Sequence, residues 1–144
     1  MKQIRRYLKA TRDRGLVINP VCDSNGVADV LQIDNYPDAG FAGMYGYEKP
    51  TDPARAESRT GFTITVAAGL VLWISKLQTE TALSTMEAEI VALSHSCKEL
   101  FLIMDMVGSL GPALGIPAGD TTMKVSVHKD NAGALILAQK LPPE

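Results

Sequence analysis

The fold is decided by the stretch Ser84-Thr85-Met86-Glu87-Ala88-Glu89-Ile90-Val91-Ala92-Leu93-Ser94. This stretch opens a long helical pattern, in which apolar residues recur every three or four positions: Met86, Ile90, Leu93, Cys97, Phe101 and Met104. Ser84 and Glu87 form a capping box, which satisfies backbone N–H groups at the helix start. Glu89 has no such local role and lies beside the apolar stripe. We therefore expect Glu89 to belong to a charged site between this helix and a sheet.

The remaining chain alternates short apolar runs with turn residues, and this pattern predicts further strands and helices. In chain order we expect a helix at 2–14, strands at 16–18, 30–38, 61–66 and 70–75, a helix at 85–110, a strand at 123–128 and a helix at 131–139. The antiparallel strands precede a helical crossover that adds a parallel strand. The sequence therefore predicts an α/β fold with a mixed sheet, a three-strand meander plus a parallel strand, flanked by helices.

Several positions between these elements carry their own expectations. Pro37 cannot donate to a sheet ladder, so it predicts a bulge or a strand end. The residues at 67–69 suit a hairpin turn, and those at 44–58 predict an exposed loop. Trp73 is expected in the core or the hairpin rather than on a binding surface.

Composition bounds the class of protein. The 144 residues, of which 46% are hydrophobic, fit one globular domain, and the net charge of -2 does not favour binding to nucleic acid or membranes. The basic residues near the N-terminus predict a solvated helix face. Cys22 and Cys97 have no metal-binding spacing, so we expect a reduced intracellular protein, in the cytoplasm or nucleus, without a zinc site. No run is long enough for a membrane span, and no secretory signal pattern is present.

Three acidic residues occupy comparable places in this layout. Asp38 ends a strand, Glu89 lies in the first turns of the long helix, and Asp130 ends the strand after it. If these elements are neighbours, their carboxylates converge at one corner of the sheet, and hard oxygen ligands of this kind suit Mg²⁺ or Mn²⁺. Spacing alone leaves another interpretation open, in which Asp130 and Asn131 cap a helix and Asp38 is a turn residue. Asp34 is a rival for the role of Asp38.

Five runs of sequence carry a resemblance to a known family, in the family's order. They are Tyr36-Pro37-Asp38-Ala39-Gly40-Phe41-Ala42-Gly43, Ser58-Arg59-Thr60-Gly61-Phe62, Trp73-Ile74-Ser75-Lys76-Leu77-Gln78-Thr79-Glu80, Ala82-Leu83-Ser84-Thr85-Met86-Glu87-Ala88-Glu89 and Lys129-Asp130-Asn131-Ala132-Gly133-Ala134-Leu135. Together they resemble the ribonuclease H domain of copia-type LTR retrotransposon Pol polyproteins. The run from Arg5 to Leu16 is similar to the segment that joins the reverse transcriptase to this domain.

The resemblance implies a function and a site. Asp38, Glu89 and Asp130 correspond to the metal-binding, catalytic carboxylates, which would use Mg²⁺ or Mn²⁺ for endonucleolytic cleavage of the RNA strand of an RNA–DNA hybrid during reverse transcription. The implied partners are the hybrid, read by its shape and backbone, and the reverse transcriptase domain of the same polyprotein. Residues 1–28 would be the connecting helix and short strand, and residues 29–144 the ribonuclease H-like domain.

The sequence also departs from the family. Gly40 stands where relatives have a second Asp, and relatives continue beyond the last residues into another strand and helix with a fourth acidic residue. We therefore expect the last strand and helix of the fold to be missing, the second metal to bind poorly and the nuclease to be impaired. Two alternatives stay open: a catalytically inactive retroelement relic that keeps the fold, and a nucleic-acid-binding module without chemistry.

Overall fold

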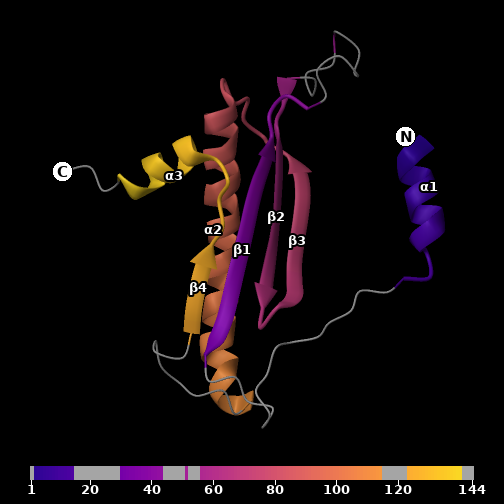
Figure 1. Ribbon diagram of the computed structural model, residues 1–144. Coiled ribbons are helices and arrows are strands. Elements are labelled where there is room, and N and C mark those ends of the chain that lie inside the picture. The colour runs from indigo at the N-terminus through magenta and orange to yellow at the C-terminus, as the bar shows by residue number, and fades with distance from the viewer. Residues whose placement is uncertain (1, 15–29, 44–50, 52–55, 115–122, 141–144) are drawn as a thin grey trace.

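The computed structural model describes residues 2–14, 30–43, 51, 56–114 and 123–140 (Figure 1). The helices and strands in this part of the chain are α1 (Lys2–Thr11), β1 (Leu31–Gly40), β2 (Arg59–Val66), β3 (Gly69–Leu77), α2 (Thr85–Leu110), the short 3₁₀ helix η2 (Gly111–Leu114), β4 (Met123–Val127) and α3 (Ala132–Gln139). The strand expected at 16–18 and most of the loop expected at 44–58 lie outside the described residues.

The strands form one mixed sheet in the order β3-β2-β1-β4. Strand β2 pairs antiparallel with both β1 and β3, whereas β4 adds to the other side of β1 in parallel. The predicted α/β fold, with a three-strand meander and a parallel strand, is confirmed. Because parallel strands end at the same edge of a sheet, the chain after β4 emerges beside the final residues of β1.

Helix α2 covers one face of this sheet, as Figure 1 shows, and the core lies between the two. Ile33, Phe62, Ile64 and Leu100 are its buried centre. Successive residues of a strand point to opposite faces, and in β3 the residues on either side of Trp73 pack against the core. Trp73 itself is 63% exposed, so it lies in the β2–β3 hairpin and not in the core, the first of its two expected positions.

Strand β1 runs through Pro37 without a bulge, which corrects the expected disruption. Pro37 stays in register opposite Phe62 of β2. The reason is the direction in which its backbone faces. Asn35, two residues earlier, accepts a hydrogen bond from the His128 N–H on the β4 side, at 2.8 Å. The backbone N position of Pro37 faces the same side, towards β4 and away from β2, so the missing N–H removes no hydrogen bond to β2. Pairing with β4 ends at Asn35, before Pro37 is reached.

The hairpin between β2 and β3 is tighter than expected. Only Ala67 and Ala68 form its loop, and Gly69 is the first residue of β3. Both alanines adopt left-handed backbone conformations, with φ of 48° and 63°. Two-residue hairpin loops need positive φ because this matches the twist of the strands, and glycine or asparagine normally supplies it. The fold therefore holds two alanines in a conformation that costs each about 1–2 kcal/mol.

Helix α2 spans the predicted residues, and two sets of polar contacts fix its start. The Ser84 side chain accepts a hydrogen bond from the Glu87 N–H at 3.1 Å, while the Glu87 carboxylate accepts from the Leu83 N–H, one residue before the expected partner. The buried Gln78 amide donates to the Thr60 hydroxyl of β2 at 3.0 Å and to the Ala88 carbonyl of α2 at 2.9 Å. Gln78 thus ties the first turns of α2 to the sheet.

The last helix begins as predicted. The Asn131 side chain caps α3 by accepting a hydrogen bond from the Ala134 N–H at 2.9 Å. Helix α1 ends three residues earlier than expected, at Thr11, and stands apart from the sheet (Figure 1). None of the helices in the described part of the chain is both long and apolar enough to cross a membrane.

Candidate functional site

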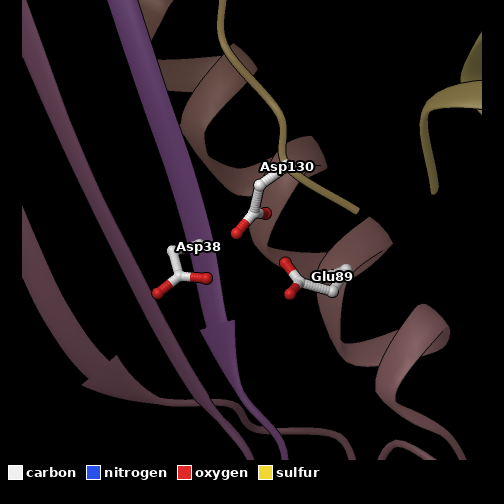
Figure 2. A group of neighbouring side chains, drawn as sticks. All are labelled: Asp38, Glu89 and Asp130. Atoms are coloured by element: carbon white, nitrogen blue, oxygen red, sulfur yellow. The ribbon is translucent and has the colours of Figure 1, made fainter. Parts of the chain in front are cut away.

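Three carboxylates from three different elements meet at one corner of the sheet. One oxygen each from Asp38, Glu89 and Asp130 lies within 4.8 Å of the others. Figure 2 shows the three side chains pointing toward one another. Asp38 and Asp130 are exposed, whereas Glu89 is buried. The structure therefore brings together the three residues that the sequence singled out, and their role as metal ligands stays a prediction.

Each carboxylate is placed by a feature of its own element. Asp38 lies near the end of β1, where the strand still pairs with β2 opposite Gly61. Glu89 lies within the first two turns of α2, directly after the residue whose carbonyl Gln78 binds. Asp130 lies between β4 and the Asn131 cap of α3. The strand end, the tethered helix start and the helix cap together hold the cluster.

A lysine that the sequence reasoning missed lies inside this cluster. The Lys129 ammonium group forms an ion pair with Glu89 Oε2. It also donates hydrogen bonds to Asp130 Oδ1 at 3.0 Å and to the Pro37 carbonyl at 3.1 Å. The side chain of Lys129 is only 1% exposed, and that of Glu89 only 7%. The available signal was the position of Lys129, directly before a candidate metal ligand, where a positive charge is out of place.

These contacts shift the pKa values of the groups involved. Burial lowers the pKa of Lys129, but its hydrogen bonds to Glu89 and Asp130 and the charges of these two residues outweigh burial, so the net shift is upward. The pKa of Asp130 is lowered, first by the hydrogen bond from Lys129 and then by its charge. The lysine is therefore a firmly charged ammonium group between two carboxylates.

The residues of the cluster suit a hard divalent cation. Carboxylate oxygens are the ligands that Mg²⁺ and Mn²⁺ prefer. Glu89 contributes a buried one, Oε2, which is paired with the Lys129 ammonium. Magnesium binds oxygen ligands at about 2.1 Å in octahedral geometry, so adjacent ligands lie about 3.0 Å apart and only one pair of three can be opposite, at about 4.2 Å. Binding of one ion by all three carboxylates would therefore require their side chains to move closer together.

A cleft of about 440 Å³ gives access to the cluster. It is lined by Tyr36, Pro37, Asp38, His128, Lys129 and Asp130. The exposed carboxylates of Asp38 and Asp130 lie at its wall, while Glu89 is not among the lining residues. A ligand in this cleft would approach the cluster from the side of the two exposed carboxylates.

The rival carboxylate Asp34 lies outside the cluster and has other partners. Its Oδ1 is 2.8 Å from Nε2 of His128 and 2.8 Å from the donating amide of Gln32. The hydrogen bond from His128 is the main reason that the pKa of Asp34 is lowered, although burial opposes it. The His128 ring also stacks on Tyr36, with ring centres 4.5 Å apart. His128 therefore lines the cleft, and Asp34 holds its ring by a hydrogen bond. Asp34 is not part of the carboxylate cluster.

Comparison with known proteins gives two partial similarities. The chain is 33% identical over 111 residues to the Retrovirus-related Pol polyprotein from transposon TNT 1-94 of Nicotiana tabacum, a match that covers 77% of this chain and 7% of that protein. This similarity gives the chain a general retroelement context. It is also 31% identical over 99 residues to Secreted RxLR effector protein 161 of Plasmopara viticola, which covers 69% of this chain and 59% of that protein. No family model and no solved structure matches the chain.

Proposed function

We propose that this chain is a ribonuclease H-like domain from a retroelement Pol polyprotein, which cleaves the RNA strand of RNA–DNA hybrids with Mg²⁺ or Mn²⁺. The observation that carries the proposal is the cluster of Asp38, Glu89 and Asp130 within 4.8 Å. The similarity to a retrotransposon Pol polyprotein gives a second, independent support.

Asp38, Glu89 and Asp130 would hold the metal. When bound, Mg²⁺ or Mn²⁺ would supply an activated water and stabilise the leaving 3′ oxygen of the cleaved strand. The chain contributes position and charge. Glu89 is held by the buried helix start, so it fixes the inner side of the site, while Asp38 and Asp130 are exposed towards the cleft. Tyr36 and His128 form a stacked wall beside them, against which a nucleic acid strand would lie.

A second cleft contains two lysines, Lys76 and Lys98, that would contact the phosphates of a hybrid. It has a volume of about 460 Å³, and its lining also includes Glu80 and His95, whose pKa is lowered by burial and by these lysines. Lys76 Nζ lies 3.0 Å from His95 Nε2. Contacts between lysine side chains and phosphates position a duplex without reading its sequence, which suits an enzyme that recognises hybrid shape.

One observation favours the inactive relic as a second candidate. The Lys129 ammonium already compensates two of the three carboxylates, so the fold keeps the cluster together without a metal. A relic of this kind would retain the geometry and lack the chemistry. The binding-module alternative draws on the basic helix α1, which stands apart from the sheet.

A cleavage assay separates these candidates. A labelled RNA–DNA hybrid is incubated with Mg²⁺ or Mn²⁺ and the natural chain, the Asp38→Asn variant, or Asp105→Asn as a matched control on the exposed side of α2. We expect metal-dependent cleavage that Asp38→Asn abolishes and Asp105→Asn retains. Absence of cleavage by the natural chain would support the relic, and hybrid binding that weakens steeply with salt, without cleavage, would support the binding module.

A further inference from the structure

The carboxylate cluster already contains a cation. The Lys129 ammonium contacts Glu89 Oε2, Asp130 Oδ1 and the Pro37 carbonyl, so oxygens from α2, from the segment after β4 and from β1 surround it. Its side chain is 1% exposed, which means that the charge is almost completely removed from water. Three oxygens around one buried positive group resemble the arrangement that a metal ion would require.

The lysine and a divalent ion have incompatible requirements for space and charge. Both need the same oxygens of Glu89 and Asp130, and the three carboxylates span no more than 4.8 Å. An ion bound there would lie a few ångströms from the ammonium, where two positive charges repel strongly in a partly buried site. Among the described residues, Asp38 forms no ion pair, so Asp38 alone of the three remains available to an arriving ion.

We infer that Lys129 is a built-in counter-ion of this site: its ammonium group occupies the place of the divalent cation, and a metal ion binds only by displacing it. This inference rests on the proposed function. It assigns Lys129 a regulatory role, because the affinity for metal then depends on how easily the lysine leaves Glu89 and Asp130. Without metal, the lysine holds the carboxylates together and offers no water-activating centre.

The long aliphatic stem of lysine makes such an exchange physically reasonable. Lysine carries its charge on a flexible four-carbon chain, so the ammonium group can move into the adjoining cleft without a backbone change. The cleft is lined by the same residue, and it opens to solvent beside the exposed Asp130. Displacement therefore moves the charge from a buried position into water.

Metal affinity gives the first test. Free Mn²⁺ is measured by its electron paramagnetic resonance signal during titration of the natural chain, the Lys129→Met variant, and Lys124→Met as a control on the exposed side of β4. Methionine matches the length of lysine and carries no charge. We expect Lys129→Met to bind Mn²⁺ more tightly by about tenfold or more, since a buried repulsive charge is removed, and Lys124→Met to resemble the natural chain. Equal affinities in all three would overturn the inference.

A labelling experiment on the natural chain keeps the test valid if Lys129→Met does not fold. Acetic anhydride modifies exposed amines, and mass spectrometry reports which lysines react. We expect Lys129 to be protected in EDTA and modified in saturating Mn²⁺, while Lys124 is modified in both. Protection of Lys129 that persists in saturating Mn²⁺ would show that the ammonium stays in place, which overturns the inference.

The outcome for the proposed function is read separately, from hybrid cleavage. Cleavage by the natural chain together with unchanged Mn²⁺ affinity in Lys129→Met would leave the proposed function standing and overturn the counter-ion role. Tighter Mn²⁺ binding by Lys129→Met without hybrid cleavage by either chain would support the counter-ion role and overturn the proposed nuclease function.

Discussion

Replacement of Glu89 by glutamine should destabilise the metal-free protein far more than an ordinary change in a first helical turn. Glutamine keeps the shape of the side chain but removes the negative charge. The Lys129 ammonium, with its side chain 1% exposed, would then keep only one charged partner, the carboxylate of Asp130, whose side chain is 83% exposed. An exposed partner contributes little because water screens it.

The magnitude follows from the burial of the pair. Removal of one member of a buried ion pair costs about 3–5 kcal/mol, because the other charge stays buried without compensation. The glutamine oxygen can still accept a hydrogen bond from the ammonium, and a hydrogen bond to a charged group contributes about 1.5–3 kcal/mol. We therefore expect Glu89→Gln to lower the free energy of unfolding by about 2 kcal/mol.

Urea denaturation in EDTA, followed by circular dichroism, measures this loss without any contribution from metal. Glu87→Gln is the matched control two residues away, and it should cost no more than about 1 kcal/mol because it weakens only an exposed helix cap. The double variant Glu89→Gln/Lys129→Met should recover most of the loss, because it removes both charges. A Glu89→Gln variant no less stable than Glu87→Gln would refute the reasoning.

Three further predictions concern other parts of the chain. The double change Ala67→Asn/Ala68→Gly should raise the free energy of unfolding by about 1–2 kcal/mol, since it relieves two left-handed alanines. The control Ala39→Gly in β1 should lower it, and both values are measured by urea titration. If the double variant gains no stability, the hairpin turn is not strained. Burial, together with two neighbouring lysines, lowers the pKa of His95 in the folded chain from 6.5. The unfolded chain therefore binds the proton first as the pH falls through 6.5, so stability should decrease there, and His95→Gln should flatten that dependence in urea titrations at pH 5 to 8. Mn²⁺ at a hundred times its Kd should stabilise the fold by about 2.7 kcal/mol, seen as a higher melting temperature, and Asp38→Asn should lose most of this gain; an unchanged melting temperature in the natural chain would count against metal binding.

Local signals were sufficient to predict most of the fold. The apolar periodicity and the Ser84 cap predicted α2 over its full length, and the capping role of Asn131 was one of the alternatives that the sequence left open. The buried face of α2, however, is formed by Ala88, Glu89, Ala92, Ser96 and Leu100, whereas Phe101 of the expected stripe is 64% exposed. Glu89, which the capping box did not need, is the buried member of the cluster. These features depend on contacts between residues close in sequence, which is why a pattern reveals them.

The errors came from contacts between distant residues. Pro37 was expected to disturb β1, but the outcome depended on which neighbour its backbone faced, and only the sheet order fixes that. The position of Lys129 before Asp130 did not reveal its other partners, because Glu89 and Pro37 are far from it in sequence. For Trp73 the sequence left the core and the hairpin open, because alternation alone does not say which face of a strand the helix covers.

Pro37 affects the path of the chain at the corner of the sheet where the carboxylate cluster lies. In a parallel ladder that already joins the His128 N–H to the Asn35 carbonyl, the next bond would run from the N–H of residue 37 to the carbonyl of His128. Proline has no such N–H, so the two strands separate at this point. The chain after β4 can then turn away from β1 and carry Lys129 and Asp130 towards α2. The cleft beside the carboxylates thus lies where one backbone donor is missing.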